Sequence, residues 1–195
     1  FLKRTSLPIE PRKLWPAGGM PRYGVKGKIP DWEQVEPGKS LSIWGDAGWG
    51  AEVKNGKYQH GRFSDDLVRA CAEMVRSWNP QPAPEWVTCI PSLRHPILVK
   101  DFAARLAKML GLRFELVLQR TDERPEQKSM ANSIQQAHNL DGALEVTGHL
   151  PRGSVLLIDD LIDSRWTVTV AGWLLRNHGS GNVFPVSLSY AGKGQ

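Results

Sequence analysis

The sequence predicts an α/β fold, a mostly parallel sheet flanked by helices, with a small β-rich attachment at the N-terminus. From residue 62 onward, strand-like and helix-like segments alternate, and the apolar run at residues 155–158 has no polar interruption. The first 60 residues instead contain fifteen of the thirty-three Gly and Pro residues. Alternation of this kind is typical of parallel sheets that bind ligands beyond the carboxyl ends of their strands. We therefore divide the chain into a connector and small β subdomain, residues 1–61, and an α/β domain, residues 62–195.

Each element has a local signal. In the attachment, the short strand candidates cover residues 41–44 and 51–53. The later strand candidates cover residues 86–90, 114–118, 143–146, 155–158 and 183–189. The expected helices cover residues 65–78, 99–110 and 167–177. Ser64 is a typical N-cap for the first helix, and Gly111 and Gly179 are typical terminators of the other two. Residues 121–139 are polar, with room for one short helix.

Composition narrows the class of protein. Hydrophobic residues make up 41% and charged residues 23% of the chain, values typical of soluble globular proteins. No apolar run approaches the roughly 20 residues that span a bilayer, so we expect no membrane partner and a cytoplasmic location. Cys71 and Cys89 lack C-x-x-C spacing and lie among apolar residues, which favours buried reduced thiols. The sequence begins at Phe1 without an initiator Met, and its first residues resemble the interior of a protein sequence. We therefore expect it to be a fragment of a longer chain.

Positive charge is concentrated at the start of the chain. Residues 1–60 hold ten Lys and Arg against six Asp and Glu, together with four of the eight Trp residues. Basic residues interleaved with aromatic ones attract phosphates and stack bases, which makes DNA a candidate partner. The candidate DNA contacts are Arg12, Lys13, Trp15, Arg22, Lys26 and Lys28. The alternative is a solvated basic face with the Trp residues in a small core.

Two acids follow the strongest strand candidate, and a polar loop then leads into a helix. The candidate sugar and phosphate residues in this stretch are Asp159, Asp160, Asp163, Ser164, Arg165 and Thr167. Carboxylates at the end of a buried strand can accept hydrogen bonds from sugar hydroxyls or bind Mg²⁺. The N-terminus of the helix can bind a phosphate. The alternative is that the acids only cap the loop.

A second loop leaves the strand expected at residues 86–90. Its candidate residues are Ser92, Arg94 and His95, which can contact a diphosphate or a nucleic-acid phosphate. The alternative is a turn that Pro91 and Pro96 rigidify, with Arg94 in solvent.

The segment at residues 155–167 resembles the signature of type I phosphoribosyltransferases. In that family the two acids hold the ribose hydroxyls, while the loop and the helix N-terminus hold the 5-phosphate. The resemblance implies phosphoribosyl pyrophosphate and Mg²⁺, through Asp159 and Asp160, as ligands of an active pocket. It also implies that Asp163 is placed to act as a base. Where the family has glycine, this chain has Arg165, followed by the bulky Trp166.

A narrower resemblance covers much of the chain. The polar segment is similar to ComF-type phosphoribosyltransferase-like proteins, whose mobile loop covers the diphosphate, in the residues Arg120, Thr121, Gln127, Ser133, Asn139, Leu140, Gly142 and Ala143. Together with residues 91–96, 127–130 and 159–167, it resembles the C-terminal domain of certain bacterial RecQ-family DNA helicases, and residues 8–16 resemble the connector before that domain. This implies a linked helicase core, single-stranded or junction DNA as partner, a nucleoid-associated location, and a role in DNA repair and recombination. The sequence has no G-x-x-x-x-G-K-[ST] loop, so it does not hydrolyse ATP by that mechanism.

Arg165 decides between three hypotheses. A side chain at a loop position that requires positive φ adds strain, and Arg165 with Trp166 can fill the space of the phosphate. Alternatively, Arg165 is itself a phosphate ligand and Trp166 packs across the loop. We favour an accessory DNA-engaging domain of a RecQ-type helicase with a degenerate, non-catalytic pocket. The other hypotheses are an active Mg²⁺-dependent phosphoribosyltransferase and a protein-docking module.

Overall fold

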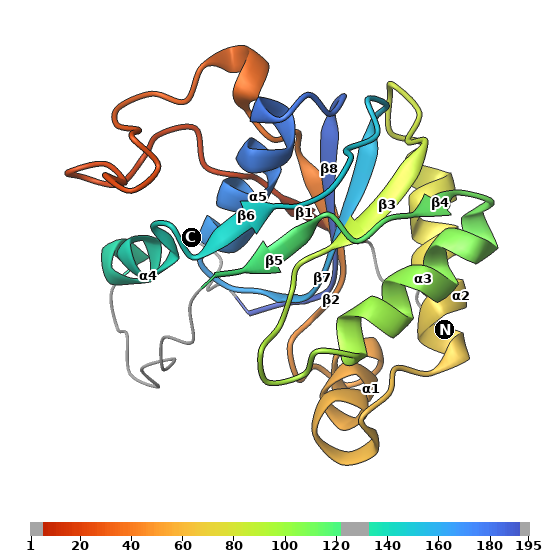
Figure 1. The fold of residues 1–195 in the computed structure, drawn as a ribbon. Coiled ribbons are helices and arrows are strands. Elements are labelled where there is room, and N and C mark those ends of the chain that lie inside the picture. The colour runs from red at the N-terminus through yellow and green to blue at the C-terminus, as the bar shows by residue number, and fades with distance from the viewer. Residues whose placement is uncertain (1–5, 122–132, 192–195) are drawn as a thin grey trace.

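The computed structural model describes residues 6–121 and 133–191, and their centre is a six-stranded sheet (Figure 1). Its strands, in spatial order, are β1 (Leu7–Ile9), β2 (Gly38–Ile43), β8 (Val183–Tyr190), β7 (Val155–Ile162), β3 (Trp86–Cys89) and β4 (Arg113–Phe114). β1 runs antiparallel to β2, and all the other neighbours in this sheet are parallel. The mostly parallel sheet of the sequence prediction is confirmed.

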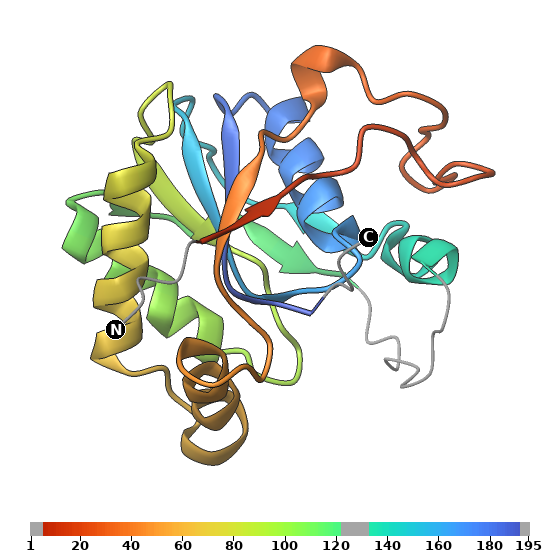
Figure 2. The ribbon, with the colours of Figure 1, turned by 180° about the vertical axis from the view of Figure 1, so that it is seen from behind.

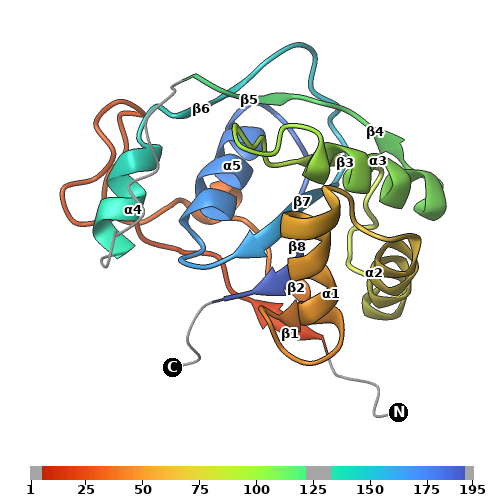
Figure 3. The same cartoon turned by 90° about the horizontal axis from the view of Figure 1, so that it is seen from below.

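Helices cover both faces of the sheet (Figure 3). α2 (Asp65–Trp78) and α3 (Leu98–Leu110) pack on one face, and α5 (Trp166–Asn177) packs on the other. Successive residues of β7 point to opposite faces, so Leu156 joins the core under α2 and α3 while Leu157 joins the core under α5. This double burial explains why the strand reads as an unbroken apolar run.

The helix ends follow the sequence signals. The Ser64 hydroxyl accepts a hydrogen bond from the Leu67 amide at 3.2 Å, which caps α2. Asn79 ends α2 in the left-handed conformation, and Gly111 ends α3 in the same way. These caps satisfy backbone groups that a helix end leaves without partners.

Residues of the predicted attachment take part in the main sheet and its core. β1 and β2 form one edge of the sheet, and the irregular segment after β1 runs past α5 (Figure 2). Trp15 is buried there, with its ring 5.2 Å from that of Trp173 on α5. A 3-10 turn, η1 (Asp31–Glu33), follows this segment. The domain boundary after residue 61 implies that each part folds independently, and it stays a prediction.

Two expected strands are wrong. Residues 51–53 belong to a helix, α1 (Trp49–Asn55), which continues into a π-helical turn, η2 (Gly56–His60). The expected strand at residues 114–118 is divided, because the chain leaves β3 after Phe114 and then forms β5 (Leu118–Arg120). β5 pairs antiparallel with β6 (Leu144–Val146) in a separate two-stranded sheet. Phe114 is therefore half-buried against the core under α2 and α3, Val117 and Leu118 join the other core, and Leu116 between them is exposed. A single local pattern does not reveal this division.

The polar segment contains one described helix, α4 (Ser133–Leu140), which packs against α5. Residues 122–132 lie outside the described part of the chain, and with them the predicted match at Gln127, Lys128, Ser129 and Met130. Within the ranges 6–121 and 133–191, no helix combines the length and the apolar character that crossing a membrane requires.

Candidate functional site

A cleft of about 740 Å³ opens at the carboxyl ends of β3 and β7, the end of the sheet seen in Figure 3. Its walls come from η2, the loop between β3 and α3, α4, and the start of α5. The predicted residues that line it are Ser92, Arg94, Asp159, Asp160, Asp163, Ser164, Arg165 and Thr167. His95 is next to this lining, with its ring 6.4 Å from the ring of Tyr58. The fold thus brings the two predicted loops together around one space.

The acid pair lies within β7, which continues to Ile162 and is longer than the sequence predicts. Asp159 is 8% exposed and Asp160 is 7% exposed, so both are buried at the floor of the cleft. The Asp160 amide donates to Asp159 Oδ1 at 2.8 Å, which fixes the Asp159 carboxyl against the strand.

Lys57, which no sequence motif singles out, forms an ion pair with the floor of the cleft. Its Nζ lies 2.8 Å from Asp160 Oδ2, and the two side chains are 16% and 10% exposed. Burial alone lowers the pKa of Lys57, but the charge and hydrogen bond of Asp160 outweigh it, so its pKa lies above the usual value. Lys57 is therefore protonated at neutral pH, and the ion pair joins η2 to β7.

Burial raises the pKa of Asp159 well above its usual range, and the negative charge of Asp160 raises it further. Two neighbouring buried carboxylates do not both ionise easily, so the shift favours a protonated Asp159. This arrangement does not suit direct binding of Mg²⁺. The Asp160 carboxylate already holds the Lys57 ammonium at 2.8 Å, and Mg²⁺ would have to displace it. In the described residues, no group of three or more His, Cys, Asp and Glu is placed to hold a metal ion.

The loop after β7 has a left-handed residue at the start of α5. Arg165 is the N-cap, with φ 69° and ψ 0°, and its side chain makes no capping hydrogen bond. The Arg165 guanidinium instead donates to the Glu10 carbonyl at 3.1 Å. The first backbone N–H groups of α5 have no partner within the helix, and Thr167 and Val168 carry two of them beside the cleft. This is the geometry of an anion site.

Trp166 supports this loop from beneath. It is 3% exposed, and its indole Nε1 donates to the Ser133 hydroxyl at 2.9 Å. The Arg12 guanidinium lies 4.7 Å from the Trp166 ring centroid, and Arg12 Nε donates to the Ser164 carbonyl at 3.0 Å. Arg12 and Trp166 therefore hold the loop in place, and Trp166 does not line the cleft.

The other candidate DNA contacts lie apart from the cleft lining. Trp15 is 6% exposed, so its ring is not available for base stacking. Lys13, Arg22, Lys26 and Lys28 are exposed. Lys28 Nζ lies 2.9 Å from Asp31 Oδ1, in an exposed ion pair of the kind that contributes little. Their contact with DNA stays a prediction.

The loop after β3 is held by one contact within the loop and one from β5. The Ser92 hydroxyl accepts from the His95 amide at 3.1 Å, and Arg120 Nε donates to the Pro91 carbonyl at 3.3 Å. Arg120 also lines the cleft, where it adds a fourth basic side chain to those of Lys57, Arg94 and Arg165. These four basic side chains outnumber the three acidic ones of the lining, Asp159, Asp160 and Asp163, by one, and this small excess of cations favours an anionic ligand.

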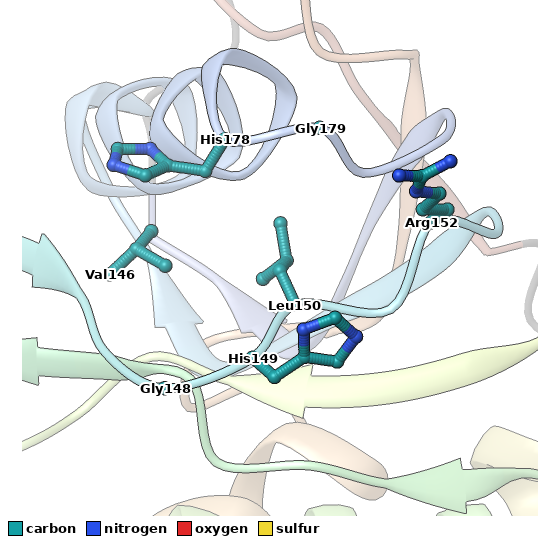
Figure 4. A pocket seen from close by; sticks show the side chains of 7 residues that line it. All are labelled: Val146, Gly148, His149, Leu150, Arg152, His178 and Gly179. Atoms are coloured by element: carbon teal, nitrogen blue, oxygen red, sulfur yellow. The ribbon is translucent and has the colours of Figure 1, made fainter.

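A second cavity, of about 620 Å³, lies at the opposite end of the sheet (Figure 4). His149 and Arg152 line it from the segment before β7, and His178 lines it from the end of α5. All three side chains are exposed, and His178 Nδ1 is 2.7 Å from the Leu174 carbonyl of its own helix. The cavity contains none of the predicted site residues, and we place the candidate site in the cleft.

The chain is similar to solved phosphoribosyltransferase structures. One is orotate phosphoribosyltransferase from Aeropyrum pernix, with 19% identity, coverage of 60% of this chain and 53% of that chain, and a TM-score of 0.38. An adenine phosphoribosyltransferase is 16% identical, with coverage of 66% of this chain and 81% of that chain and a TM-score of 0.44. The Helicobacter pylori xanthine-guanine-hypoxanthine phosphoribosyltransferase is 12% identical, with coverage of 69% of this chain and 87% of that chain and a TM-score of 0.42. This chain thus spans about half the length of the Aeropyrum pernix enzyme. No family model matches the sequence, and no curated protein matches it.

Proposed function

We propose that the cleft binds the phosphate of a sugar phosphate or of a DNA end, without phosphoribosyl transfer, in an accessory DNA-engaging domain of a RecQ-type helicase. The observation that carries the proposal is the uncapped N-terminus of α5, which faces a cleft lined by four basic side chains. A phosphate there accepts hydrogen bonds from the backbone N–H groups and gains from the helix dipole. Thr167 adds a hydroxyl donor, and Arg94 a guanidinium.

The acid pair supports binding without transfer. Transfer requires carboxylates that hold the ribose hydroxyls as positive charge develops at C1. Here Asp160 is already paired with Lys57, and the raised pKa of Asp159, caused first by burial, favours its neutral form. The left-handed Arg165 also puts a long side chain at the rim of the cleft. These features weaken the catalytic parts and leave the phosphate-binding parts in place.

The DNA and helicase parts of the proposal rest on the sequence resemblance and on charge. The chain has a formal net charge of +5, and exposed Lys13 and Lys26 lie on the segment after β1. This segment reaches the cleft, since Arg12 bonds the Ser164 carbonyl. A DNA strand with its end in the cleft would find these lysines along its backbone, which supplies affinity that depends on salt.

The test is the fluorescence anisotropy of labelled single-stranded DNA with either a 5′ phosphate or a 5′ hydroxyl. We expect tighter binding of the phosphorylated strand, by about tenfold for one well-placed charged contact. Thr167→Val should reduce that preference, whereas Lys108→Met, on α3, should not change it. Equal affinity for both strands would contradict a phosphate site in the cleft.

Two further outcomes distinguish the alternatives. Phosphoribosyl pyrophosphate with Mg²⁺ should yield no pyrophosphate with any nucleobase, and its release would show an active transferase. Binding of neither DNA strand nor phosphoribosyl pyrophosphate would support the protein-docking module.

A further inference from the structure

Lys57 is held in a defined position by the turn that carries it. Gly56 begins η2 and packs so tightly that a Cβ there would come within 2.8 Å of the Phe63 ring and 3.0 Å of the Arg62 carbonyl. The Ser64 hydroxyl donates to Glu52 at 2.5 Å, which ties α1 to the start of α2. Here the turn directs Lys57 to the floor of the cleft rather than into solvent.

The electrostatics of that floor require a cation. The buried Asp160 carboxylate brings negative charge to the floor, and a phosphorylated ligand would bring more to the same space. Sites that place substrate phosphates beside carboxylates commonly hold Mg²⁺ between them, through one or two carboxylates and the phosphate oxygens. In this protein the ammonium of Lys57 lies 2.8 Å from Asp160 Oδ2.

We propose that Lys57 bridges Asp160 and the phosphorylated ligand, so that the cleft binds this ligand without a divalent cation. The inference rests on the proposed function and adds the cation requirement of the same site. An ammonium has three N–H donors. Asp160 accepts one of them, and Lys57 also lines the cleft, where a ligand oxygen can accept another. The Lys57 ammonium thus neutralises the negative charge between Asp160 and the ligand, as a bound metal ion would.

A variant that lacks the Lys57 ammonium should show the opposite dependence on Mg²⁺. Lys57→Met keeps a long apolar stem but leaves the Asp160 carboxylate without its cation. The empty space beside Asp160 is then open to Mg²⁺, a hard cation that carboxylate oxygens bind. Removal of Lys57 should therefore change binding from independent of Mg²⁺ to dependent on it.

The experiment measures the preference for 5′-phosphorylated over 5′-hydroxyl DNA, in excess EDTA and in MgCl₂ at matched ionic strength. We expect the full chain to show the same preference in both buffers. Lys57→Met should lose the preference in EDTA, by about tenfold, and regain it in MgCl₂. Lys57→Arg should retain it in EDTA, because it keeps the charge, and Lys54→Met, an exposed lysine of α1, should behave as the unaltered chain.

Several results would overturn the inference. A preference of the unaltered chain that appears only in MgCl₂ would show that the cleft needs the metal despite Lys57. A Lys57→Met variant that remains folded by circular dichroism and keeps its preference in EDTA would show that Lys57 does not contact the ligand. If Lys57→Met unfolds, the Lys57→Arg variant and the EDTA series on the unaltered chain still decide. No preference in either buffer would overturn the proposed function itself, and the inference with it.

Discussion

Arg165 allows the strain at the start of α5 to be measured. Its φ of 69° lies in the left-handed region, where a residue with a Cβ pays about 1–2 kcal/mol. We compare Arg165→Gly with Arg165→Ala, because both lose the same guanidinium bond to the Glu10 carbonyl. Glycine removes the Cβ strain but loses about 0.5–1 kcal/mol through its freer unfolded chain. These two ranges subtract to between about 0 and 1.5 kcal/mol, and their midpoints predict that the unfolding free energy favours glycine by about 0.75 kcal/mol.

The assay is urea denaturation of both variants, followed by circular dichroism, with thermal melting as a second measurement. For a chain of this length the difference corresponds to roughly 1–4 °C in Tm. An alanine variant more stable than the glycine variant would refute the left-handed conformation of residue 165.

The remaining predictions concern other parts of the same structure. The raised folded-state pKa of Asp159 makes the unaltered chain lose stability as pH rises above about 4, the pKa of an unfolded Asp. The stability of Asp159→Asn relative to the unaltered chain should therefore increase with pH above that value. Urea midpoints at several pH values measure this difference, and a difference that stays constant with pH contradicts it. Trp166→Ala should lower the unfolding free energy by about 3–5 kcal/mol and Trp166→Phe by less, since Trp166 is buried; equal losses would disprove a packing role. Cys71 and Cys89, whose pKa burial raises to about 12, should react with a disulfide reagent only after unfolding; rapid reaction of the native protein would contradict their burial. Lys13→Ala should reduce the salt dependence of DNA binding by about one unit of slope; an unchanged slope would place the backbone contact elsewhere.

Most of the fold is readable from local patterns. α2 and α3 have strong apolar stripes with a cap or terminator at their ends, and β7 is an apolar run because both of its faces are covered. The end of β7 was harder to predict, since Asp159 and Asp160 look like loop residues. They stay in the strand because β8 pairs with β7 as far as Ile162.

The site was predictable where one segment carries the chemistry. The acid pair and the loop to Thr167 come from a single stretch, and the carboxyl ends of parallel strands meet at one edge of the sheet. The sequence does not predict the role of Lys57, because its partner Asp160 is distant in sequence and the turn that carries Lys57 has no motif of its own. Arg12 resembled a DNA contact by charge alone, whereas its bonds to Ser164 and its position over Trp166 depend on the tertiary fold.

The most direct test of the phosphate site is a chemical-shift map of the isotope-labelled chain titrated with a 5′-phosphorylated dinucleotide. A phosphate bound in the cleft should give its largest backbone amide shifts at residues 164–168 and 92–94, at the start of α5 and in the loop after β3. Shifts confined to residues 12–28, or to the cavity around His149 and His178, would contradict it.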